Sequence, residues 1–167
     1  RSDTSLAGFN VKQKGEGTWV VGTANTNETF RGVINNLDQA GSHPGTTSIE
    51  KQGSGDWRLT GKNDYSGTTV ITAGRLIVNG QHTGKGIVTV RKGATLAGTG
   101  SLAGAVTVNI GGTLQVGDTL VTDHGLTFSG GLKLNNGAIL QVNDAMMDHN
   151  YQAGDEIHAF SGNVTGA

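Results

Sequence analysis

The chain has 167 residues with 12 basic and 13 acidic side chains and no cysteine, and these counts already exclude several classes of protein. The length suits one ordinary domain or one continuous solenoid segment. The balanced charge, without any basic block, argues against nucleic acid or an anionic membrane as the main partner. Without cysteine there are no disulfides or thiolate metal sites, and no apolar run is long enough to insert into a bilayer.

Glycine is the most abundant signal in the chain, with 29 residues against a single proline, Pro44. A disordered linker would be richer in proline and charge and poorer in Val, Leu and Ile, and the glycines lack the three-residue period of collagen. The start, "RSDTSLAGFN", has no signal-peptide features, so we expect any export signal upstream. The end, "SGNVTGA", has no polar closing element, so we interpret the chain as a fragment.

The first part of the chain contains two similar stretches, "KQKGEGTWVVG" (12–22) and "KQGSGDWRLTG" (51–61). Their tryptophans, Trp19 and Trp57, lie 38 residues apart, a distance that corresponds to about two solenoid coils. Residues 12–80 are therefore predicted to form paired coils that are rich in tryptophan and glycine.

Two stretches interrupt the pattern. Residues 35–47 are polar and hold the only proline, which predicts a loop inserted between coils. Residues 143–154 are the only helix candidate, and we predict a loop there as well. The whole chain, 1–167, is thus expected to be a single segment without a second domain.

Four later segments share a template in which an apolar residue is followed by a turn glycine and then, two or three residues on, by a leucine. The leucines are 20, 18 and 26 residues apart, a spacing typical of solenoid coils with a longer loop in the last interval. Residues 81–167 are therefore predicted to form Gly-x-Leu coils. The segments are 69–80, 89–100, 107–118 and 133–144, with turn glycines Gly74, Gly93, Gly111 and Gly137 and leucines Leu76, Leu96, Leu114 and Leu140.

Within each coil the apolar residues alternate with polar ones, as in a β-strand. Val106 and Val108 point to one side and Thr107 to the other, and after the glycine corner Leu114 points inward and Gln115 outward. One coil cannot bury its apolar face alone, so coils must stack, about 4.8 Å apart, around a shared interior. We predict an all-β fold, a right-handed single-stranded parallel β-helix, with the four leucines in one internal file and outward Thr and Asn in ladders.

The stretch "KQGSGDWRLTGKNDYSGTTVITAGRLIVNG" (51–80) resembles the passenger-associated repeat of Gram-negative autotransporters. Residues 93–118 look like the coils that commonly follow this repeat, and 151–166 are similar to a later Gly-Asp coil. The resemblance covers most of 12–166 and is weaker before residue 48. The residues that match the repeat are Gly53, Gly55, Trp57, Leu59, Gly61, Tyr65, Gly67, Thr69, Gly74 and Leu76.

The resemblance implies a protein that is secreted or displayed on the outer membrane exterior, in a family associated with adhesion and virulence. It implies export of the unfolded passenger through an outer-membrane pore, with coil formation outside assisting transport. We therefore expect a non-catalytic stalk segment that folds during export and presents other regions. The alternatives are an adhesin or carbohydrate-binding module that uses the 35–47 loop or the threonine rows for host-surface or glycan ligands, or the non-catalytic part of a polysaccharide-degrading enzyme.

Aromatic residues are the first candidates for ligand binding. Trp19 and Trp57 could form a sugar-stacking platform if matching registers set them near one another, but alternation with apolar neighbours places both inward and favours core packing. Tyr65 and Phe30, each shortly before a glycine, are expected to cover coil corners.

Charged residues are scattered, and no catalytic, cofactor-binding or metal-binding residue is predicted. Asp56 and Arg58 flank Trp57 and are interpreted as a surface ion pair. The "GTG" at 98–100 precedes no helix, which a phosphate-binding loop needs. Uncapped ends would expose strand edges, so end-to-end self-association is also predicted. The five histidines lack the spacing of a metal site, and they are His43, His82, His124, His149 and His158. The loosely clustered carboxylates also lack the spacing of a calcium loop, and they are Asp144, Asp148, Asp155 and Glu156. The outward strand positions are neutral, for example Thr107, Gln115 and Gln141.

Overall fold

The computed structural model describes residues 16–36, 45–116, 125–142 and 164–166. Within these ranges every regular element is a β-strand, and no helix is present that could cross a membrane. The strands form three sheets, here called A, B and C, in which every pairing is parallel.

From β3 to β16 the strands follow one another in the order sheet A, sheet B, sheet C, and then return to sheet A one layer further along. Sheet A contains β1 (Glu16–Val21), β3 (Thr46–Lys51), β6 (Thr69–Ile71), β9 (Val88–Val90), β12 (Val106–Val108), β15 (Leu132–Leu134) and β17 (Val164–Gly166). Sheet B contains β2 (Glu28–Phe30), β4 (Asp56–Leu59), β7 (Arg75–Val78), β10 (Thr95–Gly98), β13 (Thr113–Val116) and β16 (Ile139–Val142). Sheet C contains β5 (Lys62–Asn63), β8 (Gln81–His82), β11 (Ser101–Leu102) and β14 (Thr127–Phe128).

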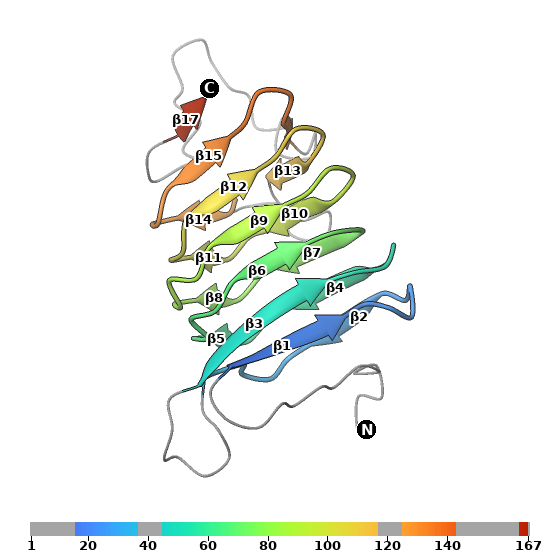
Figure 1. The fold of residues 1–167 in the computed structure, drawn as a ribbon, viewed down its shortest axis with the longest axis vertical. Coiled ribbons are helices and arrows are strands. Elements are labelled where there is room, and N and C mark those ends of the chain that lie inside the picture. Colours follow the sequence, from blue (N-terminus) through green and yellow to red (C-terminus); the bar gives the residue numbers. More distant parts are fainter. Residues whose placement is uncertain (1–15, 37–44, 117–124, 143–163, 167) are drawn as a thin grey trace, which may run out of the picture.

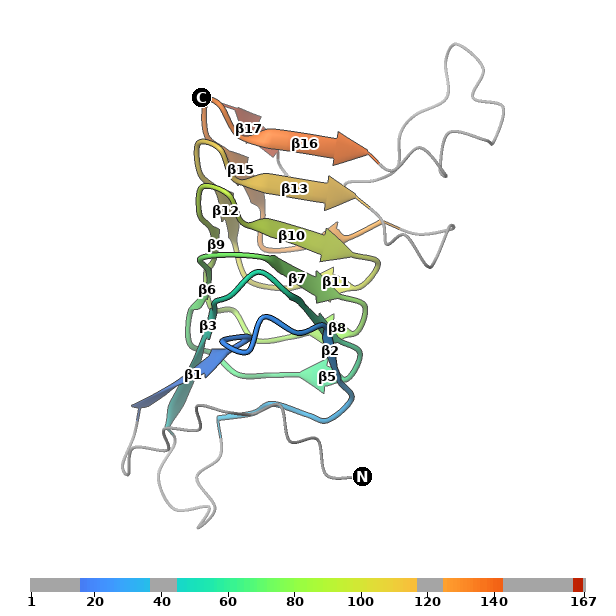
Figure 2. The same ribbon diagram turned by 90° about the vertical axis from the view of Figure 1, so that its right-hand side faces the viewer.

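This winding confirms the predicted parallel β-helix. Figure 1 shows the strands of sheet A stacked as successive rungs, and Figure 2 shows sheet B stacked in the same way on an adjoining face. In sheet A, Ile49 is paired with Thr69, Thr69 with Val88 and Val88 with Val106, so the regular coils contain 20, 19 and 18 residues. The coil length expected from the leucine spacing is therefore the length that the backbone adopts.

The predicted file of leucines is also confirmed. Leu76 is paired with Leu96, Leu96 with Leu114, and Leu114 with Leu140, and the file continues in the other direction to Trp57. Leu96 and Leu114 are fully buried, whereas Leu140, in the last described strand of sheet B, is 43% exposed. Leu76, Leu96 and Leu114 are thus covered by the coils on either side of them, as expected of a solenoid.

The corner between sheets A and B is formed by the predicted turn glycines. Gly74, Gly93, Gly111 and Gly137 all have positive φ, between 62° and 80°, a conformation that is strained for a residue with a Cβ atom. Polar ladders form next to this corner, where Asn135 Nδ2 donates to Asn109 Oδ1 over 2.9 Å. The sequence thus located both the bends and one kind of side-chain ladder.

The two tryptophan stretches, in contrast, are not equivalent in the structure. Trp19 lies in β1 of sheet A and is paired with Ile49, whereas Trp57 lies in β4 of sheet B and is paired with Leu76. The two tryptophans therefore lack the matching register that a sugar-stacking platform would need. The reason is that the two stretches meet the winding at different points of the coil, which local similarity cannot reveal.

The predicted loop insertion ends earlier than expected, because β3 already begins at Thr46. Residues 37–44 lie outside the described part of the chain. The base of the insertion is closed by Asn36, whose Oδ1 accepts from the backbone N–H of Thr47 and of Ser66 at 3.1 and 2.9 Å. One amide side chain therefore joins both ends of the inserted segment to the next coil.

Candidate functional site

Among the described residues, the polar side chains that are at most 2% exposed all lie in the coils of residues 51–82, and we call this group the polar core. It was not predicted from the sequence, which indicated an apolar interior throughout. Its members are at most 2% exposed, and they are Lys51, Asn63, Tyr65, Thr69 and His82.

Lys51 occupies a position that is apolar in the neighbouring coils of sheet A, since it is paired with Val21 on one side and Ile71 on the other. Its ammonium group donates to three backbone carbonyls at the A–B corner, those of Gln52 (2.6 Å), Gly53 (3.0 Å) and Ala73 (3.2 Å). Burial lowers the pKa of Lys51, and the nearby Asp56 carboxylate opposes this shift. The lysine therefore acts as an internal cation that satisfies turn carbonyls of two adjacent coils.

Tyr65 and His82 form the second part of the polar core. Their rings stack with centroids 4.2 Å apart, and the Tyr65 hydroxyl lies 2.7 Å from Thr69 Oγ1. Burial raises the pKa of Tyr65 to about 12, although the Thr69 hydrogen bond works in the opposite direction. Tyr65, between β5 and β6, thus fills the interior of the β-helix at the corner between sheets C and A.

His82 is paired with Asn63 in the previous coil and Leu102 in the next. Its Nδ1 lies 3.3 Å from the Asn63 carbonyl, while its buried Nε2 has no hydrogen-bond partner. Burial lowers the pKa of His82, opposed by the Asn63 carbonyl and by the charge of Asp64. A neutral imidazole that stacks on Tyr65 suits this position better than a metal ligand.

The aromatic residues proposed as a sugar platform are used for packing instead. Trp57 is 4% exposed and its ring lies 6.2 Å from that of Phe30, which is in β2 rather than at a corner. Trp19 is partly buried and packs against the core from sheet A. The inward orientation predicted for both tryptophans is therefore confirmed, and they form no common surface.

Asp56 has a different partner from the one predicted. Both of its carboxylate oxygens accept from Arg75 in the next coil, at 3.0 and 2.5 Å, rather than from Arg58 on the same strand. Arg75 Nη1 also donates to Gln115 Oε1 over 3.3 Å. Gln115, predicted to be exposed on the outer face, is only 7% exposed. The pairing follows the register, which aligns Asp56 with Arg75 across one coil spacing.

The remaining candidates lie largely outside the described residues. This applies to four of the five histidines and to the loose carboxylates of residues 144–156. Among the residues that the structure describes, no group of three His, Cys, Asp or Glu side chains could hold a metal ion. The 98–100 glycines lie where coils approach closely, since a Cβ atom on Gly98 would be 2.1 Å from the Val78 carbonyl oxygen.

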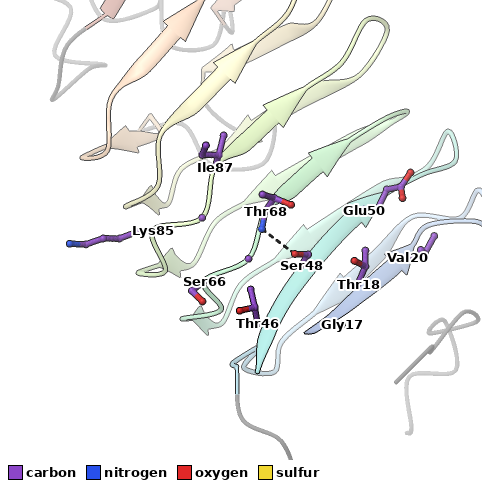
Figure 3. A pocket seen from close by; sticks show the side chains of 12 residues that line it. Gly17, Thr18, Val20, Thr46, Ser48, Glu50, Ser66, Thr68, Lys85 and Ile87 are labelled. Atoms are coloured by element: carbon purple, nitrogen blue, oxygen red, sulfur yellow. Dashed lines mark hydrogen bonds between the residues drawn. The ribbon is translucent and has the colours of Figure 1, made fainter. Parts of the chain in front are cut away.

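A shallow groove of about 870 Å³ lies on the outer side of sheet A, over β1 and β3, and we call it the hydroxyl groove. Figure 3 shows its hydroxyl side chains, with Ser48 accepting from the Thr68 backbone N–H over 3.2 Å. Its two charged lining residues, Glu50 and Lys85, lie at opposite ends. The hydroxyl residues that line it are Thr18, Thr46, Ser48, Ser66 and Thr68.

A second groove, of about 900 Å³, follows the A–B corner across the coils of β9, β12 and β15, and we call it the corner groove. Its lining combines two exposed cations, Arg91 and Lys92, with amides and hydroxyls. No residue of this groove was predicted from the sequence to bind a ligand, although a signal was present. From Tyr65 to Val116 the sequence contains four basic residues and no acidic one. The polar and charged lining residues include Thr72, Thr89, Arg91, Lys92, Asn109 and Asn135.

Comparison with known proteins gives two matches. Residues 49–78 match the passenger-associated transport repeat. The chain is also 45% identical over 74 residues to the adhesin BmaC autotransporter of Brucella suis biovar 1 (strain 1330). This alignment covers 44% of the present chain but only 2% of the relative, so the chain spans a very small part of that protein. No solved structure matches the chain.

The repeat coincides with the coils that contain most of the polar core, from Ile49 to Val78. The chain therefore carries an autotransporter passenger repeat, and it is a surface-exposed passenger segment. Its location is accordingly outside the cell, secreted or at the cell surface.

Proposed function

We propose that this segment is a non-catalytic stalk of the passenger and that the repeat at 49–78 starts its folding outside the cell. The proposal rests chiefly on one observation, the bonds that tie the repeat to the coils on both sides of it. Trp57 contacts Phe30 of the preceding coil, outside the repeat, and the Asp56–Arg75 ion pair joins two coils within the repeat. Tyr65 stacks on His82, again one coil further along.

These links favour early folding of the repeat because a solenoid folds by adding coils to a nucleus. Each link joins residues about one coil apart, so the loop that must close is short and its entropy cost is small. In the coils of β9–β13 the described interior is aliphatic, and stability there depends on neighbouring coils being present. In a passenger that emerges unfolded, a nucleus of this kind would fix the point from which the other coils are added.

Two matched substitutions test the folding role. Leu76 and Leu114 belong to the same file and are both at most 1% exposed, but only Leu76 lies inside the repeat. Each change to alanine should cost roughly 2–5 kcal/mol. We expect Leu76→Ala to slow refolding about tenfold or more, and Leu114→Ala to act mainly by accelerating unfolding.

The measurement is stopped-flow tryptophan fluorescence of the full 167-residue chain during refolding from urea and unfolding into urea. Equilibrium unfolding of both variants provides the reference for the two rates. If Leu114→Ala slows refolding as much as Leu76→Ala, the repeat is not the nucleus and the proposal fails.

The non-catalytic part of the proposal is supported by the neutral or paired side chains on the outer strands, such as Thr107 and the Asp56–Arg75 pair. Carbohydrate chemistry on such a surface would need converging carboxylates or a base. Incubating the purified chain with neutral and acidic polysaccharides should produce no new reducing ends or unsaturated uronates. Turnover that co-purifies with the chain would contradict this.

A second candidate role is adhesion, and it is favoured by a specific observation. The relative from Brucella suis is named an adhesin, and the present chain offers two open grooves on its outer surface. In this role the same stalk would contact a host-surface or glycan ligand directly. The corner groove gives this role a defined chemistry.

A further inference from the structure

The charges of the described β-helix are unevenly distributed along its axis. Acidic side chains occur in the first coils, at Glu28, Glu50, Asp56 and Asp64. From Tyr65 to Val116 and from 125 to 142, all the charged residues of the sequence are basic. One of them, Arg75, is neutralised by Asp56, so the later coils present an excess of positive charge.

The corner groove lies in this basic half of the molecule. Arg91 and Lys92 follow β9 directly and are exposed, and neither has an ion-pair partner among the described residues. Lys133 lies two coils further along the outer side of sheet A, in register with Thr107 and, through it, with Thr89. The two cations that line the groove thus lie together in one coil, and Lys133, which is not part of the lining, adds a positive charge two coils further along.

The floor of the groove is rigid and supplies further polar groups. Asn135 donates to Asn109 Oδ1, which leaves the amide nitrogen of Asn109 as a donor beside the cations. Backbone bonds run from Gly93 N–H to the Gly111 carbonyl and from Gly111 N–H to the Gly137 carbonyl, each 2.8 Å long. A ligand would thus meet donors that are already held in place, which reduces the cost of ordering them.

We propose that the corner groove binds an extended acidic polysaccharide, one that carries sulfate or carboxylate groups, laid across the coils of β9, β12 and β15. The cations supply charge complementarity, while the amides and hydroxyls match a polyhydroxylated chain. An elongated groove with repeating rungs fits a linear polymer better than a compact anion. Ile110, 66% exposed on the groove wall, offers an apolar contact for a sugar face.

Other anionic partners fit the groove less well. A protein partner would be expected to use buried aromatic anchors, and the described lining of the groove contains no aromatic residue. Single-stranded nucleic acid is disfavoured because the described lining has no aromatic side chain on which bases could stack. The inference rests on the adhesive role proposed above, since only a passenger outside the cell meets such glycans.

The test is binding of the full chain to immobilised heparin, polygalacturonate and neutral dextran at low and physiological salt. The double variant R91Q/K92Q should bind the acidic polymers at least tenfold more weakly. The control R31Q/K62Q removes one arginine and one lysine from exposed sites in the first coils and should bind within twofold of the unaltered chain. The slope of log K against log salt should fall by between one and two in R91Q/K92Q only.

Each other result overturns the proposal. Equal weakening of binding in the two double variants would indicate a general charge effect. Binding to neutral dextran as tight as binding to the acidic polymers would indicate that the anionic groups of the polymer play no role. No binding to either acidic polymer at low salt would show that the groove does not bind acidic polysaccharides. Tighter binding to anionic lipid vesicles or to duplex DNA would show that the groove binds another class of anionic partner. Heparin and polygalacturonate together distinguish sulfate from carboxylate recognition. Thermal melting shows that the variants are folded, and the refolding comparison of Leu76 and Leu114 is unaffected by any of these outcomes.

Discussion

The repeat coils, residues 49–82, and the later coils, residues 88–116, share one backbone winding but differ in what fills and closes it. The interior of the repeat coils contains a lysine, a histidine, a tyrosine and an asparagine, whereas the interior of the later coils is aliphatic. Their corners differ as well. A Cβ atom on Gly74 would lie 2.4 Å from the Gly53 carbonyl oxygen, but one on Gly93 would meet nothing within 4 Å.

The later coils show that coils can stack without the polar core. The interior of the later coils reaches full burial with aliphatic residues, as Val90, Val108 and Leu114 show. The polar groups of the repeat add directional bonds, which only one alignment of neighbouring coils can satisfy. We therefore interpret them as devices for specifying register at the point where folding starts.

The largest effect is expected from the corner glycines. Both Gly74 and Gly93 have positive φ, at 62° and 78°, so alanine strains the backbone at either site. Gly74→Ala should also push the coils apart and cost at least about 3 kcal/mol, whereas Gly93→Ala should cost only about 1–2 kcal/mol. Urea denaturation measures both. Equal losses would show that the corners of the two regions are packed alike.

Tyr65 should make the repeat coils sensitive to alkali. Its pKa in the folded protein is about 12, above the usual 10, so the folded state holds the proton over this interval. Stability is complete below pH 10 and is lost as the pH rises towards 12, with about 2 kcal/mol gone by pH 11.5. Comparing urea midpoints at pH 9 and 11.5 should show a smaller drop for Tyr65→Phe. The same drop in both proteins would remove Tyr65 as the cause.

Lys51 tests whether an internal cation is needed at all. Lys51→Met keeps most of the buried stem but leaves three carbonyls without their donor, which is partly offset because no charge is buried. We expect a net loss of about 1–2 kcal/mol. Lys62→Met, at an exposed site in β5, should change stability by less than about 0.5 kcal/mol. If Lys51→Met is as stable as the unaltered chain, the internal cation is not needed and an aliphatic interior throughout would serve equally well.

His82 should give the smallest effect, on the acid side. Burial lowers its pKa below the usual 6.5, with Asn63 and Asp64 working against the shift. The unfolded chain therefore takes up a proton first, so stability is complete above about pH 6.5 and falls as the pH drops towards the folded-state pKa. Between pH 7.5 and 5.5, His82→Leu should lose less stability than the unaltered chain, because leucine does not titrate. Leucine should fit at this position, since Leu102 is paired with His82 in the same file. Parallel curves for the two proteins would contradict the assignment.

The parts of the fold that could be predicted were those with a local signal. The strand alternation around Thr107, the corner glycines and the file from Leu76 to Leu140 each recur once per coil, so the sequence displays the same evidence several times. The partner of Asp56 and the position of Trp19 could not be predicted in this way. Both depend on which residue of another coil lies opposite, and that depends on the summed length of the turns between them.

The amino-acid sequence by itself determined that the chain winds into stacked coils, because period-two strands with glycine bends have an apolar side that only another coil can cover. The tertiary structure decided which polar groups those coils enclose and which they bring together outside. Lys51 and His82 had no interior role predicted from the sequence, and the register aligns them with the buried Ile71 and Leu102. Arg91 and Asn135 come from separate coils and border one groove only after stacking. Alternation is a property of the single strand, whereas a site that spans coils exists only once their backbones are bonded to one another.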